Sequence, residues 1–313
     1  FFYDVTKHGH SKPEAHQLWK EITESASSYS FNKSHSACYA RLTYITAYLK
    51  YYYPQYFYSA LMTASNAKST ELAQKEISEI LIEVKERGIK ILPPDMNESD
   101  DNFKPTKEGI RYSIASIRNV GQSAVNHIKE IRPIESLDDV LKRSKKKYLR
   151  KNVMDMIIKA GCFDFENPNR EKMLKRYYDW RKEEYEEKEW NLERLLEYEK
   201  ETLGFYLTKH PMDKYSFKYI DDYNDGDNCV LGGEVIEVVE RYDKNGGKMA
   251  FITLNSNQGN IKCLVFATIW NKRGSNIQDV LKENNIVLVE GKKDKHSCLV
   301  YNAETIEGDS VEN

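Results

Sequence analysis

The chain has no apolar run that approaches the roughly 18 to 20 residues needed to cross a membrane, so the sequence excludes a membrane span. It also has no basic-then-apolar leader, and Phe1 stands where an initiator Met would, which favours a fragment or a processed piece. Cysteines are few, and no CxxC pair or Cys/His cluster occurs. Neither a disulfide framework nor a zinc site is therefore predicted, and a reducing, cytoplasmic setting fits. The five cysteines are Cys38, Cys162, Cys229, Cys263 and Cys298.

An excess of positive charge is missing as well. The formal net charge is −2 over 313 residues, which excludes a uniformly basic protein that coats DNA. Any contact with nucleic acid must come from local basic patches. With 40% hydrophobic and 31% charged residues the composition is that of a soluble globular protein, and the length favours two or three domains.

The sequence also lacks a recognisable catalytic centre. No GxxxxGK[ST], GxSxG or HExxH motif is present. Metal-dependent nucleotidyl transfer needs carboxylates that converge on divalent ions. The aspartate pairs at 100–101, 138–139 and 221–222 stand beside turns or helix starts and are typical of caps or solvated charge. We therefore predict no catalytic residue and no metal ligand in this chain.

Helical periodicity dominates the first two thirds. Leu42, Ile45 and Leu49 predict a helix that Pro54 interrupts, and the apolar spacing over 72–84 predicts another that ends at Gly88. Several short helices are expected between 103 and 164. The segment from 170 to about 202, with nine Glu against five Lys or Arg over 181–201, predicts one or two long surface helices that form a solvated spacer.

Short β-rich runs follow position 229. They lie at 230–239, 249–254, 261–266, 286–290 and 299–303, with a hairpin turn at Asn245-Gly246-Gly247 and a helix expected at 277–283. Five strands with a helix between the third and fourth predict an OB-fold barrel.

The stretch Ile117-Arg118-Asn119-Val120-Gly121-Gln122-Ser123-Ala124, followed by Ile128, suits a helix-hairpin-helix. Gly121 would allow the hairpin to turn and would let backbone N–H groups at the next helix approach a phosphate. Such contacts grip the DNA backbone without reading sequence. An ordinary helical hairpin with no ligand explains the pattern equally well.

A basic run follows at 142–151, with seven cations in ten residues and no acid. A solvated basic face is the commonest meaning of such a run, but its place beyond the hairpin favours phosphate contacts. The residues we assign to DNA binding in the two segments are Arg118, Asn119, Gly121, Gln122, Ser123, Lys145, Lys146, Lys147, Arg150 and Lys151.

Two further clusters are candidates. Lys33 and His35, in the polar stretch Phe31-Asn32-Lys33-Ser34-His35, could hold a triphosphate, although a plain N-cap at Asn32 or Ser34 explains that stretch nearly as well. In the barrel region Phe251 and Phe266 alternate with cations, as on a single-strand binding face, but core packing is the favoured interpretation of both rings. The barrel cations assigned to a nucleic-acid face are Arg241, Lys244, Lys248 and Lys262.

In this order, these segments resemble the bacterial C-family replicative DNA polymerase, the α subunit of DNA polymerase III. The matching segments are 31–36 with Tyr39-Ala40 (FNKSHS…YA), Tyr53-Pro54 with Phe57, 88–97 (GIKILPPDMN), 117–121 (IRNVG), 149–164, 201–212 (ETLGFYLTKHPM), 248–251 and 287–291. The resemblance runs from about 15 to 305. Its departures are the absence of the family's glycine around 113–116 and the absence of Gln between 123 and 257, which argues against an internal peptide that binds the sliding clamp.

The resemblance implies four parts: the C-terminal part of the fingers (1–100), a tandem helix-hairpin-helix domain (101–168), a helical connector (169–228) and an OB-fold (229–313). It also implies that Mg²⁺ belongs to a palm domain that would precede residue 1, that Lys33 and His35 lie near the incoming nucleotide, and that the partners are primer-template DNA, single-stranded template and the rest of the polymerase. The cell would be bacterial or phage-infected. The competing hypothesis is a stand-alone, non-enzymatic DNA-binding protein built from hairpin and barrel modules.

Overall fold

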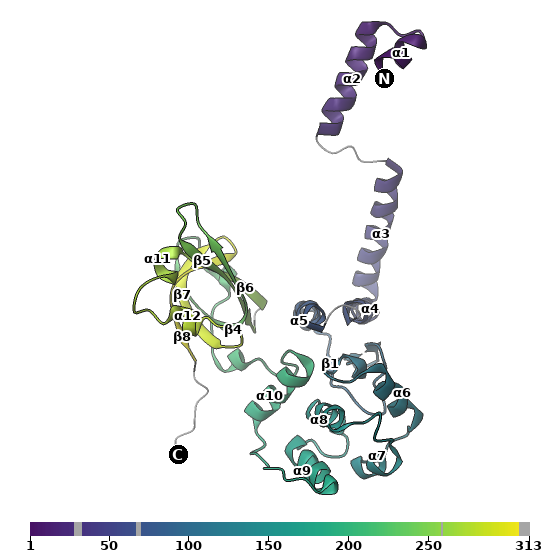
Figure 1. The fold of residues 1–313 in the computed structure, drawn as a ribbon, viewed down its shortest axis with the longest axis vertical. Helices are drawn as coiled ribbons and strands as arrows, with labels where there is room; N and C mark the ends of the chain where they lie inside the picture. Colours follow the sequence, from purple (N-terminus) through teal and green to yellow (C-terminus); the bar gives the residue numbers. More distant parts are fainter. Residues whose placement is uncertain (28–32, 67–69, 258, 307–313) are drawn as a thin grey trace. The chain divides into compact units, whose positions relative to one another are not determined.

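The computed structural model describes residues 1–27, 33–66, 70–257 and 259–306, and these form two compact units, 1–57 and 58–313. The first unit is helical (Figure 1). Its helices are α1 (Phe2–Lys7), α2 (Lys12–Ser27), α3 (Lys33–Tyr52) and the first residues of α4 (Pro54–Asn66). Pro54 ends the α3 pattern as predicted and is itself the first residue of α4, a position that needs no N–H donor.

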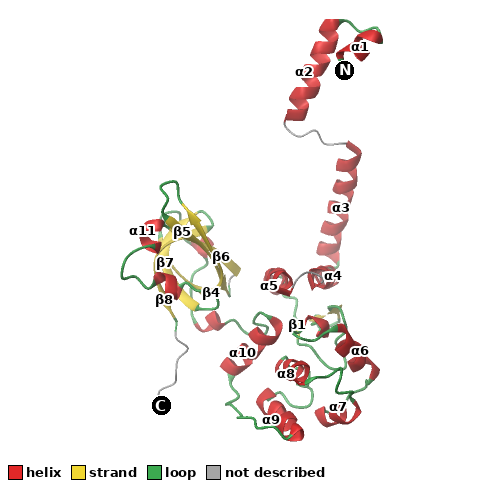
Figure 2. Ribbon diagram, viewed as in Figure 1, coloured by secondary structure: helices red, strands yellow, loops and turns green. Residues whose placement is uncertain are grey.

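The second unit opens with helices and a small sheet. After α4 come α5 (Thr70–Glu86), β1 (Ile91–Leu92), β2 (Lys104–Pro105) and β3 (Ile110–Arg111), paired in the order β1-β3-β2. The predicted helix over 72–84 is α5, and Gly88 follows it with a φ of +69°. This small sheet and the barrel hold the strands of the described residues, and helices make up most of the rest (Figure 2).

Short helices then surround two tight turns. They are the 3-10 helix η1 (Ile114–Ser116), α6 (Gln122–Glu130), α7 (Leu137–Arg143) and α8 (Lys151–Lys159). Ser136 caps α7 by accepting a hydrogen bond from the Asp139 N–H at 3.2 Å. Apolar residues of these helices, such as Ile128, Leu137 and Ile157, are fully buried, so the two turns rest on one packed core.

The connector is formed by α9 (Arg170–Arg181) and α10 (Leu192–Leu203), followed by the 3-10 helices η2 (Pro211–Lys214) and η3 (Ile220–Asp222). The prediction of one or two helices is confirmed, with residues 183–190 between them not helical. The prediction of a solvated spacer is wrong, because several polar side chains are buried. Glu199 is 1% exposed because it accepts hydrogen bonds from the backbone N–H groups of Leu207 and Thr208, at 2.7 and 2.9 Å.

The last part is a closed five-stranded barrel in the order β4-β5-β6-β8-β7 (Figure 1). Its strands are β4 (Asn228–Tyr242), β5 (Lys248–Ser256), β6 (Gly259–Val265), β7 (Ile286–Asp294) and β8 (Ser297–Thr305). The pairing of β6 with β8 is parallel and the others are antiparallel. All five predicted strands are present, and the predicted architecture of helices followed by an OB-fold barrel is confirmed.

Two details of the barrel explain its sequence. The connection between β6 and β7 holds two short helices, α11 (Ala267–Trp270) and α12 (Ile277–Val280), where we predicted one over 277–283. Gly291 on β7 is required by space: a Cβ there would lie 2.2 Å from Cys298 Sγ and 2.6 Å from Leu299 O. Cys298 Sγ in turn lies 3.4 Å from Cys229 Sγ, so Gly291, Cys298 and Cys229 share one part of the barrel core.

No helix in the described part of the chain is long and apolar enough to span a membrane.

Candidate nucleic-acid interface

The first hairpin joins η1 to α6 through residues 117–121. The residue with a left-handed backbone is Asn119, whose φ is +63°, an angle that asparagine tolerates better than most residues. Gly121 is the N-cap of α6 with a φ of −83°, and a Cβ there would meet nothing within 4 Å. The expectation that Gly121 is needed for the turn is therefore wrong. Glycine is also common at the N-cap of a helix, which is the position of Gly121.

The five residues assigned to DNA binding on this hairpin are exposed: Arg118, Asn119, Gly121, Gln122 and Ser123. The turn is held from one side by α10, because the Arg118 N–H donates to Thr202 O at 2.9 Å. The Gln122 side chain donates to Asp101 Oδ1 at 3.1 Å and to Asn126 Oδ1 at 2.9 Å. No side chain caps the start of α6, so its first backbone N–H groups lie uncapped at an exposed turn, before the Ala124 N–H that donates to Gly121 O at 2.9 Å.

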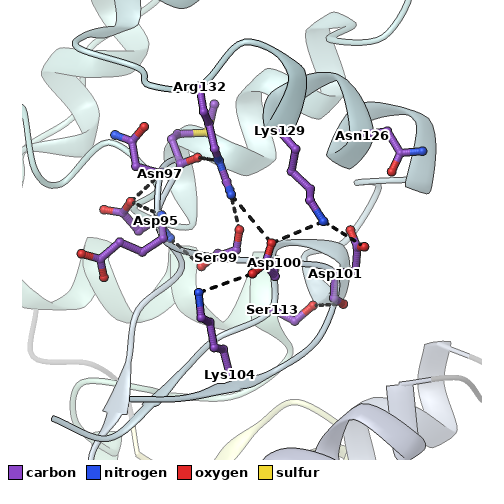
Figure 3. A network of polar contacts seen from close by, with 12 residues as sticks. Asp95, Asn97, Ser99, Asp100, Asp101, Lys104, Ser113, Asn126, Lys129 and Arg132 are labelled. Atoms are coloured by element: carbon purple, nitrogen blue, oxygen red, sulfur yellow. Dashed lines mark hydrogen bonds and ion pairs between the residues drawn. The ribbon is translucent and has the colours of Figure 1, made fainter. Parts of the chain in front are cut away.

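A polar network beneath α6 fixes this hairpin to the segment 95–101 (Figure 3). The Asn97 side-chain amide makes two hydrogen bonds of 2.8 Å with the backbone of Ile134, one to its C=O and one from its N–H. Arg132 donates to Met96 O at 2.7 Å and to Ser99 O. No local pattern in the sequence reveals that Asn97 and Arg132 pair with segments more than thirty residues away.

The second hairpin joins α7 to α8, and the basic run forms its turn. Lys145, Lys146, Lys147, Arg150 and Lys151 are exposed. Lys145 Nζ lies 3.9 Å from Glu130 Oε1, and Lys151 Nζ lies 2.5 Å from Glu183 Oε2. Lys147 Nζ lies 4.6 Å from the centre of the Tyr148 ring. The turn therefore presents a cluster of cations of which two have carboxylate partners.

His127 joins the two hairpins. Its side chain is 2% exposed, and its Nε2 accepts a hydrogen bond of 2.9 Å from the Lys145 N–H in the second turn. Because that N–H can only donate, Nδ1 carries the ring proton and donates to Glu130 Oε2 at 3.1 Å. The ring also packs against Tyr148, with centroids 5.0 Å apart. No local pattern indicates the role of His127, because its partner is eighteen positions away and reaches it by a tertiary contact.

The barrel cations do not share one face. Arg241 and Lys262 lie on the same outer side of β4, β5 and β6 as Phe251, since Val239 pairs with Phe251 and Thr253 pairs with Lys262. The Arg241 guanidinium carbon lies 5.6 Å from the centre of the Phe251 ring.

The other two barrel cations differ. Lys248 has the opposite strand parity and pairs with Glu240 at 2.5 Å, and Lys244 lies in the β4–β5 turn. Phe251 and Phe266 are 41% and 48% exposed, so the interpretation of both rings as core residues is wrong. An exposed ring beside a guanidinium suits stacking of a base, whereas Lys262 Nζ donates to Thr253 Oγ1 at 2.9 Å and lies 3.8 Å from Glu237 Oε2.

The first-unit candidates are only partly described. Phe31 and Asn32 lie outside the described residues, and Lys33 is the first residue of α3. His35 is exposed on α3, with its ring centre 4.3 Å from that of Tyr39. The assignment of Lys33 and His35 to nucleotide binding stays a prediction.

Two of the three aspartate pairs, at 100–101 and 138–139, are engaged with cations. Asp101 Oδ2 lies 3.2 Å from Lys129 Nζ, and Asp100 Oδ1 lies 3.4 Å from the same nitrogen (Figure 3). Burial acts to raise the pKa of Asp100, but Lys129, Lys104 and Arg132 outweigh it and the pKa is lowered. In the second pair, Asp138 contacts Arg176 and Asp139 contacts Arg143. Within the described ranges, no three His, Cys, Asp or Glu side chains are grouped so as to hold a metal ion. These carboxylates do not fit Mg²⁺, because each faces a cation of the protein.

Known proteins match both the hairpins and the whole chain. Residues 88–173, which hold both hairpin turns, match a family model described as a helix-hairpin-helix motif. Over 94% of its length the chain is 31% identical to the DNA polymerase III subunit alpha of Aquifex aeolicus (strain VF5), and it covers 26% of that relative. It is 30% identical to the subunit of Staphylococcus aureus (strain MRSA252), again over 94% of the chain and over 29% of the relative.

Among solved structures, the second OB-fold domain of replication protein A from Methanococcus maripaludis matches 30% of the chain and 97% of that domain, at 19% identity and a TM-score of 0.23. A match at that level carries no functional argument. The chain spans between a quarter and a third of the length of the curated relatives it matches. Over 94% of its length the chain is similar to DNA polymerase III subunit alpha, and it carries a helix-hairpin-helix region followed by a closed five-stranded barrel.

Proposed function

We propose that this chain is the DNA-holding section of a bacterial-type replicative DNA polymerase. The observation that carries the proposal is the pairing of two exposed hairpin turns, bridged by His127, in a region that matches a helix-hairpin-helix model. One turn offers uncapped backbone N–H groups and the other offers a cluster of cations, and together they suit successive phosphates of duplex DNA. The primer-template would be the ligand, and the location would be the cytoplasm of a bacterial or phage-infected cell.

The barrel would hold the single-stranded template. Arg241, Phe251 and Lys262 support this part, because an exposed ring on the same outer side as two cations can stack on a base while the cations follow the backbone. Lys33 and His35 would contribute to the nucleotide pocket, as the resemblance implies. The reaction would be template-directed transfer of a deoxynucleotide, with Mg²⁺ held by carboxylates of a palm outside this chain. The sliding clamp stays a possible partner without an internal clamp peptide.

A partner that carries the palm is favoured by the surface of α3. This helix exposes a series of large apolar and aromatic side chains: Tyr39, Leu42, Tyr44, Ile45, Tyr48, Leu49, Tyr51 and Tyr52. Exposed apolar patches of this kind mark protein interaction sites. A stand-alone DNA-binding protein has no use for such a helix, so we favour the polymerase section over that alternative.

Binding to labelled primer-template, measured by fluorescence anisotropy across a salt series, tests the proposal. We expect affinity to fall at least tenfold between about 50 and 200 mM salt. Replacing Lys145, Lys146 and Lys147 by alanine should weaken binding and reduce the slope of log affinity against log salt by about two to three.

A matched control removes three exposed barrel cations, Lys272, Arg273 and Lys282, and should leave the slope unchanged. Equal effects of the two triple variants would mean that DNA senses only net charge, which would contradict a hairpin site. Absence of binding at 50 mM salt would refute the proposal itself. Extension of the primer by the pure chain with Mg²⁺ and deoxynucleotides would contradict the assignment of the palm to another chain.

A further inference from the structure

A small hollow lies at the second hairpin turn, where the basic loop meets the end of α9. Its volume is about 220 Å³. Four cations line it, together with two aromatic side chains and an apolar floor that includes Leu149. The cations and rings are Lys146, Arg150, Lys151, Arg181, Tyr177 and Trp180. Neither the helix-hairpin-helix pattern nor the basic run predicts an aromatic wall, because both rings come from the connector helix.

One ring of the aromatic wall is buried and the other is exposed to solvent. Tyr177 is 1% exposed, and Trp180 stacks on it with centroids 6.4 Å apart and ring planes at 17°. Trp180 itself is 43% exposed. The Lys146 ammonium lies 5.5 Å from the centre of the Trp180 ring, so a cation covers this ring in the DNA-free chain.

The cations of the hollow are only half neutralised. Lys151 and Arg181 both contact Glu183, at 2.5 and 2.6 Å, and hydrogen bonds from Arg181 and then Lys151 lower the pKa of Glu183 to about 2. Among the residues that the structure describes, no carboxylate lies within ion-pair distance of Lys146 or Arg150. The hollow therefore has a surplus of positive charge next to an exposed π-face.

The volume of the hollow, its positive charge and its exposed indole ring indicate the chemistry of its ligand. The volume is below the roughly 300 Å³ at which pockets for whole drug-sized ligands begin, so one planar group fits better than a complete small molecule. A cation pair next to an indole ring suits a nucleotide, whose base stacks on the ring and whose phosphate needs positive charge. Bases inside a duplex are already stacked on their neighbours and are not free to reach the ring.

We propose that this hollow binds one unpaired nucleotide of DNA, with its base on Trp180 and its phosphate between Lys146 and Arg150. The inference deepens the proposed function and rests on it: the hairpins hold the duplex, and the hollow receives a nucleotide that has left it. Lys146 exchanges its contact with the indole for a contact with the phosphate when the nucleotide enters.

The test compares a short blunt duplex with the same duplex that carries one unpaired nucleotide at an end, both labelled for anisotropy and titrated with the full chain. Trp180→Leu keeps an apolar side chain but removes the π-face, and Trp180→Phe keeps a ring. Trp19→Leu is the matched control, since Trp19 is also 43% exposed. We expect Trp180→Leu to weaken binding of the overhang DNA by between about 5-fold and 100-fold and to change blunt-duplex binding by less than about twofold. Trp180→Phe should recover most of the loss.

Tryptophan fluorescence supplies a second readout on the same samples. The overhang DNA should quench emission in the wild type and in Trp19→Leu, and the additional quenching relative to blunt duplex should disappear in Trp180→Leu. Equal binding of overhang and blunt DNA by the wild type would overturn the inference, as would equal losses for both DNAs in Trp180→Leu. These outcomes leave the proposed function standing, because blunt-duplex binding still measures it. A wild type that binds neither DNA would refute the proposed function and this inference together.

Discussion

Replacing His127 by alanine tests the link between the two hairpins. The substitution removes a side chain that is 98% buried and leaves the Lys145 N–H without its acceptor. Loss of a buried ring of this size costs about 1.5 to 3 kcal/mol, and an amide left without a partner adds about 1 kcal/mol at this partly solvated turn. We therefore expect the free energy of unfolding to fall by about 2.5 to 4 kcal/mol, measured by urea denaturation with the slope held constant.

Hydrogen exchange at the Lys145 amide separates the hydrogen bond from packing. In His127→Gln the side-chain oxygen can reach the place of Nε2, so protection of this amide should be partly kept, whereas His127→Ala should abolish it. Glu130→Gln is the control, because Glu130 is 62% exposed and its pairing with His127 should be worth less than about 1 kcal/mol. If the Lys145 amide exchanges equally fast in the wild type and in His127→Ala, the histidine does not hold the basic turn and the reasoning is refuted.

Three further predictions concern single positions. Gly291→Ala should destabilise the barrel by about 1 to 3 kcal/mol in thermal denaturation, since its Cβ would lie 2.2 Å from Cys298 Sγ, and an unchanged Tm would contradict the packing. Gly121→Ala should leave the Tm unchanged, because the site is open, but should lower duplex affinity if a phosphate approaches this backbone; unchanged affinity would remove Gly121 from the interface. Burial lowers the pKa of His210 from its usual 6.5 to about 4, although the hydrogen bond to Asn255 acts to raise it. Between these two pH values the unfolded chain therefore binds a proton that the folded chain does not. Stability should therefore fall by on the order of 2 kcal/mol as the pH drops through this window, and His210→Asn, which keeps a capping acceptor, should flatten the profile in urea melts at several pH values. An equally steep profile in that variant would assign the proton uptake to other groups.

The barrel was predictable because strand periodicity is local. Along β5, Ala250, Ile252 and Leu254 are buried, and their alternation can be read from the printed sequence. The same alternation places Phe251 on the outside of the barrel. The interpretation of Phe251 as a core residue was wrong because it depended on the aromatic residue type and not on the position in the strand. The helices α11 and α12 span four residues each, too short for helical periodicity to give their bounds.

The hairpin region shows the opposite case. Both turns could be located from the sequence, but the residue expected to make the first turn was Gly121, whereas Asn119 has the positive φ. The contacts that fix the turns, from His127 to Lys145 and from Asn97 to Ile134, join residues whose identities show no pattern along the chain. Such pairings depend on tertiary packing, which a single sequence does not specify locally. Trp180 was missed for the same reason, since it belongs to the connector in sequence and to the basic turn in space.

The closure of the barrel has a mechanical consequence. Neighbouring strands elsewhere in it are in register over most of their lengths, but β6 and β8 pair only through residues 262–264 and 297–299. This is the shortest strand pairing of the barrel, so a pulling force or a mild denaturant should separate these two strands before the others. Cys263 and Cys298 are paired across β6 and β8 and become accessible to a thiol reagent when these strands separate. The rate at which they are labelled would therefore report how often the barrel opens locally.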